Sequence, residues 1–187
     1  MIIRPGHRTD RPGPVVAIPL AGYGVSPTTP TAVPDAIAPI ERVAGVRVAR
    51  CAVTAGRLDV AEYEQLVAGP EAGAVVSFAG TVRNHDAGHP VCRLVYEAHP
   101  SAADVLAKVV TDVVSTTGPG RISAVAVGHR IGALEIGETA FAVVVAAAHR
   151  GPAFATCARL VNEVKQLLPI WKHQVFANGT SEWVNCA

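Results

Sequence analysis

The sequence predicts an α+β fold, a mostly antiparallel sheet with helices packed on it. The predicted elements follow the order strand, helix, strand pair, helix, strand pair, helix and closing strands. Half of the 187 residues are apolar and only 17% are charged. A chain of this length and composition builds one well-buried domain rather than two. We therefore expect a single folded domain over residues 45–187.

Residues 1–44 have a different composition. Eight of the 14 prolines lie between Pro5 and Pro39, and neither a helical nor a strand period is visible there. We expect a Pro-rich, disordered extension. A secretory signal is the competing interpretation, since residues 15–25 are fairly apolar, but Pro19 interrupts that stretch and the proline-rich run after it is a poor cleavage context.

The first half of the domain contains three predicted strands and one short helix. Residues 46–53 alternate like an edge strand, and residues 59–67 form a helix capped by the aspartate at its start. The Val/Phe content of residues 73–80 predicts a buried strand, and residues 91–96 predict a second strand. The loop between these two strands, residues 83–90, contains a Gly-His-Pro turn.

The second half repeats the pattern. Residues 100–116 carry apolar side chains at helical spacing until a Gly-Pro-Gly segment ends the helix. Residues 121–130 and 139–149 predict two strands joined by a glycine-rich turn. Residues 152–168 predict the last helix, because proline suits a first helical turn. Closing strands follow over residues 170–184.

The chain contains three lysines, and two of them, Lys165 and Lys172, flank a Pro-Ile-Trp segment. A helix that carries Lys165 must end near Pro169, so Lys172 lies on an extended segment that folds back. Two ammonium groups on different elements suit a pocket better than a solvated helix face. Two unrelated surface lysines are the alternative interpretation.

Other polar residues stand where predicted strands end. Arg83 and His85 directly follow the first strand of the first pair, and His149 and Arg150 precede the helix that begins near Pro152. The free N–H groups and the dipole of a helix N-terminus favour an anion, and Arg150 adds a forked charged donor. This junction predicts phosphate binding, with a buried structural histidine as the alternative for His149.

We predict no metal site. His85, His89 and His99 raise the question, because His-x3-His occurs at the first two positions. That spacing spans a Gly-Pro turn, where it implies no common geometry for ligands. A cysteine nucleophile is not predicted either, because Cys157 has apolar neighbours on a helix and no base nearby in the sequence.

The overall charge and hydropathy exclude further classes of protein. A net charge of +1 provides no field for nucleic acid or an acidic membrane. The longest apolar stretch, residues 140–148, is too short to cross a bilayer. The four cysteines lack Cys-x-x-Cys spacing and suit a reducing compartment. We expect a cytoplasmic protein that binds neither nucleic acid nor membrane.

Five motifs stand in a fixed order along the domain: GAVVSFAGTVRNH at 73–85, LVYEA at 94–98, VGHRIG at 127–132, AHR at 148–150 and KQLLPIWK at 165–172. Together they resemble the catalytic, large subunit of molybdopterin synthase, the MoaE family, over residues 46–185. Several separate motifs in the same order argue against chance similarity. The resemblance implies a MoaE-like fold of the α/β hammerhead type.

The resemblance also implies a reaction. Sulfur passes from the C-terminal thiocarboxylate of a small ubiquitin-like subunit, which is MoaD-like and ends in Gly-Gly, to cyclic pyranopterin monophosphate. The product carries the dithiolene of molybdopterin. Two large subunits form a homodimer within a heterotetramer, with one small subunit at each end. No metal and no redox cofactor is implied at this step.

This reaction assigns roles to the residues singled out above. Arg83, His149 and Arg150 become candidates for binding the cyclic phosphate. Lys172 is the candidate for acid/base catalysis and Lys165 for binding the substrate or the thiocarboxylate. All five side chains are expected to converge in one cationic cavity.

Two positions depart from the family pattern. Gln174 stands where a glutamate is common, and His99 where a tyrosine is common. Gln174 can donate or accept a hydrogen bond but offers no carboxylate to balance a lysine.

Two other functions fit parts of the sequence. One is a non-catalytic docking module for a ubiquitin-like carrier protein, because the fold alone does not separate recognition from turnover. The other is an unrelated phosphate-metabolite enzyme that uses only His149 and Arg150. The lysine pair, together with the anion-binding residues Arg83, His149 and Arg150, separates the sulfur transferase from a docking module, which has little need of them. Sulfur in the pterin product distinguishes all three functions.

Overall fold

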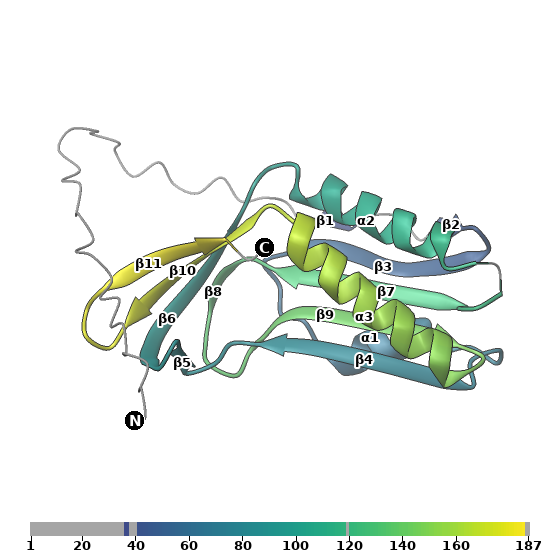
Figure 1. Ribbon diagram of the computed structural model, residues 1–187, viewed down its shortest axis with the longest axis horizontal. Coiled ribbons are helices and arrows are strands. Elements are labelled where there is room, and N and C mark those ends of the chain that lie inside the picture. Colours follow the sequence, from purple (N-terminus) through teal and green to yellow (C-terminus); the bar gives the residue numbers. More distant parts are fainter. Residues whose placement is uncertain (1–35, 38–40, 119, 186–187) are drawn as a thin grey trace, which may run out of the picture. The chain divides into compact units, whose positions relative to one another are not determined.

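The computed structural model describes residues 36–37, 41–118 and 120–185 (Figure 1). Their elements, in chain order, are β1 (Ala36–Ile37), β2 (Glu41–Val43), β3 (Val46–Thr54), α1 (Val60–Val67), β4 (Ala74–Thr81), β5 (His85–Asp86), β6 (His89–Ala98), α2 (Ala102–Thr116), β7 (Ala124–Arg130), β8 (Gly132–Leu134), β9 (Thr139–Ala147), α3 (Arg150–Leu167), β10 (Ile170–Phe176) and β11 (Ser181–Asn185).

The strands form two sheets. The larger has the order β1-β3-β7-β9-β4, with β2 also paired to β3, and the smaller has the order β11-β10-β6-β5, with β8 also paired to β6. Only β3 and β7 pair in parallel among the described strands. The predicted α+β fold with mostly antiparallel sheets is confirmed.

Helices cover both faces of the larger sheet. Helices α2 and α3 lie on one face (Figure 1). They bury Leu106 and Leu160 there, in one core cluster with Val125 and Val143. On the other face α1 buries Tyr63 against alanines of β7 and β9 and against Val144. Because both faces are covered, the central strand β9 reads as a continuous apolar run rather than an alternating one.

Two expectations about strand exposure were wrong. The strand predicted over residues 46–53 is not an edge strand, because β3 lies between β7 on one side and β1 and β2 on the other. The strand predicted as buried over residues 73–80 is the edge strand β4, whose residues alternate between half-buried and exposed. Val75 on β4 is 44% exposed.

The ends of several elements also differ from the prediction. Helix α3 begins at Arg150 instead of residue 152, and β8 occupies part of the expected turn around Gly132. Strands β1 and β2 stand before the predicted boundary at residue 45 and pair with β3. The rest of the predicted extension, residues 1–35 and 38–40, lies outside the described residues and stays a prediction.

Local signals in the sequence explain where the helices begin and end. The Asp59 side chain accepts a hydrogen bond of 2.9 Å from the Ala61 amide and caps α1, as predicted. Helix α3 ends at Leu167, two residues before Pro169, and the chain continues directly into β10. None of the helices in the described part of the chain is both long and apolar enough to span a membrane.

Candidate active site

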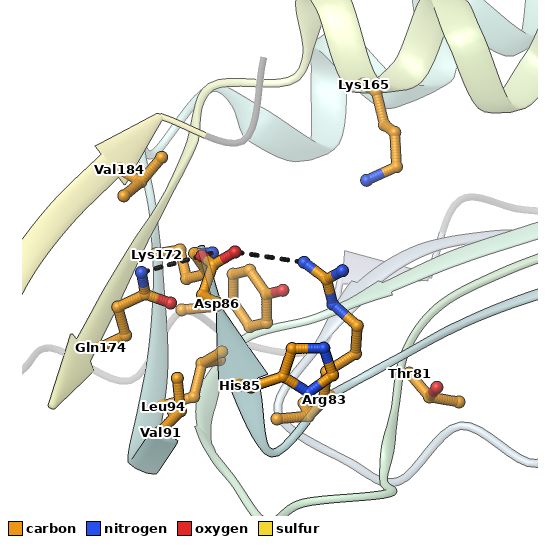
Figure 2. Close-up of a pocket in the computed structure, with 12 residues that line it drawn as sticks. Thr81, Arg83, His85, Asp86, Val91, Leu94, Lys165, Lys172, Gln174 and Val184 are labelled. Atoms are coloured by element: carbon orange, nitrogen blue, oxygen red, sulfur yellow. Dashed lines mark hydrogen bonds and ion pairs between the residues drawn. The ribbon is translucent and has the colours of Figure 1, made fainter. Parts of the chain in front are cut away.

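A cavity of about 360 Å³ lies where the smaller sheet meets the ends of β4 and α3 (Figure 2). Its wall combines cationic, acidic, amide and aromatic side chains with a few apolar ones. The lining residues are Thr81, Val82, Arg83, His85, Asp86, Val91, Leu94, Tyr96, Lys165, Lys172, Gln174 and Val184. A volume of this size is typical of a pocket for a small molecule.

Two of the three lysines project into this cavity from different elements. Lys165 stands in the last turn of α3, where a cation complements the helix dipole, and its ammonium points toward the cavity (Figure 2). Lys172 is the third residue of β10, and its side chain is 17% exposed. The proline between the two elements turns the chain back, so residues seven apart in sequence face the same space.

Asp86 is the centre of the polar contacts in the cavity (Figure 2). Its Oδ2 accepts hydrogen bonds from Lys172 Nζ at 2.7 Å and from Gln174 Nε2 at 2.9 Å. Its Oδ1 accepts from an Arg83 guanidinium nitrogen at 3.1 Å. The bonds from Lys172 and Gln174 lower the pKa of Asp86 to about 2, so the carboxyl group stays ionised near neutral pH.

A tight hairpin fixes the position of Asp86. The two residues between β5 and β6, Ala87 and Gly88, have φ angles of 45° and 84°. Positive φ at both central residues is what a type I′ turn requires, and this turn matches the twist of paired strands. Asp86 therefore lies directly opposite His89. The sequence predicted a turn here but not the short strand that carries Asp86.

Gln174 connects Asp86 to a second carboxylate. The residue is 1% exposed, and its Nε2 donates to Asp86 and also to Glu182 Oε1. Glu182 stands opposite Gln174 in the pairing of β10 with β11. The amide thus uses its two N–H groups on two carboxylates. A glutamate at this position cannot do so, because an ionised carboxylate donates no hydrogen bond and a protonated one donates only one.

His149 and Arg150 lie outside the cavity. His149 is the cap residue of α3 and Arg150 its first residue, whereas Lys165 is in its last turn. At 1.5 Å per residue, 15 residues of helix separate Arg150 from Lys165 by about 22 Å. A single cavity that joins all five predicted residues is therefore not present within one chain. His149 is exposed, so the alternative of a buried structural histidine was also wrong.

The histidines considered for a metal have separate partners. His85 lines the cavity, with Nδ1 at 2.8 Å from Asn84 Oδ1. His89 packs edge-on against Phe176, and His99 contacts Ser101. No cluster of three or more metal-ligating side chains occurs among the described residues.

Comparison with known proteins identifies the family of this chain. The model of the family described as "MoaE protein" matches residues 53–167, which is more than half of the chain. The chain belongs to the MoaE family. The match extends from the end of β3 to the end of α3, so it includes Arg83, Asp86 and Lys165 but ends before Lys172.

Individual MoaE proteins resemble the chain over a longer range. Molybdopterin synthase catalytic subunit 1 of Mycobacterium tuberculosis is 40% identical over 138 residues, which cover 72% of this chain and 89% of that protein. Molybdopterin synthase from Staphylococcus aureus, a crystal structure, has a TM-score of 0.64 and 28% identity, covering 71% of this chain and 94% of that one.

A third relative shows the fold alone. A chain from the Helicobacter pylori complex of subunits 1 and 2 of molybdopterin-converting factor has a TM-score of 0.55 and 20% identity, covering 71% of this chain and 87% of that one. The match to the family model and the 40% identity to the Mycobacterium tuberculosis protein carry more weight than this 20% identity. They show that this MoaE chain has the function of a molybdopterin synthase catalytic subunit and is an enzyme, not the docking module considered as an alternative.

Proposed function

We propose that this chain transfers sulfur from the C-terminal thiocarboxylate of a small ubiquitin-like subunit to cyclic pyranopterin monophosphate, forming the dithiolene of molybdopterin. The observation that carries the proposal is the convergence of Arg83, Lys165 and Lys172 on one cavity. With Asp86 as the only carboxylate in the described lining, the site has an excess of positive charge. Both proposed reactants are anions, so this charge favours their binding.

The two lysines have different surroundings, which supports different roles. Lys172 is held by Asp86, whereas the Lys165 ammonium has no carboxylate partner among the described residues. A free ammonium is available to bind the thiocarboxylate. A held ammonium keeps one orientation, which suits a group that donates a proton as the phosphate ester opens and water leaves. We assign Lys165 to binding and Lys172 to acid/base catalysis.

Arg83 is our candidate for the phosphate of the substrate. One of its terminal nitrogens contacts Asp86, and its side chain is 65% exposed toward the cavity and solvent. The remaining N–H groups of the guanidinium stay available for two parallel hydrogen bonds to phosphate oxygens. Asp86 would hold the guanidinium plane while the phosphate binds.

His149 and Arg150 contribute to phosphate binding in this proposal only through the homodimer. Both are exposed at the start of α3, so a second copy can bring them to its own cavity. An apolar groove of about 350 Å³ lies between β4 and α3, and it is lined by Phe154, which stands one turn after Arg150 on the helix and is 60% exposed. Exposed apolar surface of this kind is typical of a protein interface. The homodimer, with one small subunit at each end, is the expected assembly.

The small subunit would supply its Gly-Gly tail to the cavity. Val184 on β11, an edge strand of the smaller sheet, lines the cavity together with Lys165 and Lys172, and an extended tail that enters along this edge would meet both lysines. The proposal includes a reducing compartment such as the cytoplasm, which free thiols like those of the three described cysteines suit.

The decisive experiment incubates the chain with cyclic pyranopterin monophosphate and a thiocarboxylated small subunit. Sulfur in the pterin product, measured by mass spectrometry, is the expected result. A small subunit that ends in an ordinary carboxylate is the matched control and should give no sulfur. If the two proteins form a stable complex and no sulfur reaches the pterin, the chain is not the transferase proposed here.

A further inference from the structure

The cavity contains one carboxylate in an unexpected place. The resemblance to MoaE put Gln174 on β10 at a position where a glutamate is common, which suggested that Lys172 has no acidic partner. The structure instead places Asp86, from the hairpin between β5 and β6, at 2.7 Å from Lys172 Nζ. The carboxylate that contacts Lys172 thus comes from the hairpin and not from β10.

We propose that Asp86 is the positioning residue for Lys172 in this enzyme, and that Asp86, Gln174 and Glu182 act as one set that replaces a glutamate on β10. The inference rests on the proposed function, because it concerns the lysine to which that function assigns proton transfer. Asp86 acts through Lys172 and through Arg83, with no contact to the reacting atoms required.

The first support is that Lys172 contacts Asp86 in a site with little exposure to solvent. Its side chain is 17% exposed and that of Asp86 is 25% exposed. An ammonium group that has lost most of its water needs a compensating acceptor. Asp86 provides it from a rigid hairpin, which fixes the direction in which the ammonium points.

The second support is the hydrogen-bond pattern around Gln174. Its amide donates to Asp86 on one side and to Glu182 on the other, so two acceptors surround one donor group. A glutamate at 174 would bring three carboxylates together with no donor between them. Glutamine therefore fits this position because Asp86 is ionised.

The third support is the charge that surrounds Asp86 on every side. Lys172 approaches from β10, Arg83 from the segment before β5, and Lys165 from α3 across the cavity. His89 stands opposite Asp86 in the hairpin, and Glu182 on β11 is reached only through Gln174. Without Asp86, three cations would share the cavity with no carboxylate among its described lining residues. Lys172 would then be free to turn toward an incoming anion.

The test compares three variants of the full chain assembled with its small subunit. Asp86→Asn removes the charge and keeps the shape. The triple variant Asp86→Asn, Gln174→Glu, Glu182→Gln moves the carboxylate to β10. It reverses donor and acceptor in the two bonds of residue 174, so these two hydrogen bonds are preserved and the carboxylate for Lys172 comes from residue 174. Asp112→Asn is the matched control, because Asp112 pairs with Lys108 at 2.6 Å on the surface of α2.

We expect Asp86→Asn to lower kcat about 10- to 100-fold, to change KM for the pterin less than about threefold, and to alter the pH profile of kcat. The triple variant should recover kcat to within about tenfold of the wild type, and Asp112→Asn should behave as the wild type. If Asp86 acts by placing a carboxylate beside Lys172, a carboxylate at position 174 should restore kcat. A purely structural role of Asp86 in the hairpin predicts no such recovery.

A second readout does not depend on turnover. Limited acylation at fixed pH, followed by peptide mass spectrometry, reports on each of the three lysines. We expect Asp86→Asn to raise the acylation rate of Lys172 about threefold or more relative to Lys108, because the carboxylate no longer holds and covers the ammonium. The triple variant should return the rate toward the wild-type value.

The outcomes are separable. Wild-type kcat and pH profile in Asp86→Asn would overturn the inference, and so would a loss of kcat that the triple variant, folded with a normal melting temperature, does not recover. If the wild type itself transfers no sulfur, the proposed function fails, and the acylation rates alone then decide whether Asp86 controls Lys172.

Discussion

Lys172 Nζ and Asp86 Oδ2 lie 2.7 Å apart although 86 positions separate the two residues in the chain. Asp86 lies on β5 in the first half of the domain, and Lys172 lies on β10 near its end. The contact exists because β6 pairs with β10. This pairing brings the β5–β6 hairpin, which carries Asp86, against the side chains of β10. The cavity therefore forms only when the smaller sheet is complete, which couples its chemistry to the folding of the C-terminal strands.

The lysine pair gives the first prediction. We expect Lys172→Ala and Lys165→Ala each to lower the formation of sulfur-containing pterin at least about 100-fold, as is common for the loss of a proton-transfer or binding cation. The assay is the single-turnover reaction with a thiocarboxylated small subunit. Both variants should keep the wild-type circular dichroism spectrum, since neither side chain belongs to the buried core.

The third lysine of the chain provides the control for this experiment. Lys108 is 75% exposed on α2 and pairs only with Asp112 among the described residues. Lys108→Ala should therefore retain full activity. Normal turnover by Lys172→Ala would remove that residue from the proposed acid/base role, whatever happens to Lys165.

The separation of Arg150 from the cavity gives the second prediction. We expect Arg150→Ala and Lys172→Ala to be weakly active alone and to complement each other when mixed as exchanging subunits. If Arg150 serves the cavity of the partner, a mixed dimer contains one intact site, and random mixing should recover about a quarter of wild-type activity. If both residues served the same chain, mixing would recover none. Absence of recovery in a confirmed mixed dimer would contradict a shared site.

The low pKa of Asp86 gives the third prediction. Its folded value of about 2 lies below the ordinary value of 3.8, so the ionised group stabilises the fold above pH 4 and that contribution disappears as the pH falls toward 2. We expect the wild type to exceed Asp86→Asn by about 1 kcal/mol in free energy of unfolding at pH 6, because solvent screens part of the effect. Urea unfolding at several pH values measures the difference. A difference that stays constant down to pH 2 would contradict it.

Much of the fold could be predicted because its signals are local. The Asp59 cap, the apolar spacing of α2 and the proline after α3 depend on a few neighbouring residues. The exposure of β3 and β4 could not be predicted, because it depends on which strands lie beside them. The alternation of β3 resembled that of an edge strand, yet β7 pairs with it in parallel from 70 or more residues away.

The site was predicted in part for a related reason. The proline between Lys165 and Lys172 indicated that the two amines face the same cavity. In the structure both line that cavity together with Arg83. Asp86 was missed because its role depends on the Ala-Gly turn that follows it and on the pairing of β6 with β10. The Ala-Gly pair itself was the one local signal that could have indicated a fixed carboxylate, because a two-residue turn places Asp86 in a tight hairpin.

The packing of α3 gives the last prediction. Leu160 is fully buried against the larger sheet, whereas Leu167, seven residues later on the same helix, is 57% exposed. We expect Leu160→Ala to lower the free energy of unfolding by about 2–5 kcal/mol, because it removes buried methyl groups and leaves a cavity. Leu167→Ala changes helix propensity little and should cost less than about 1 kcal/mol. Urea unfolding of both variants measures the contrast. Equal losses would contradict the burial of Leu160 against the larger sheet, because Leu167 lies near the exposed end of the helix.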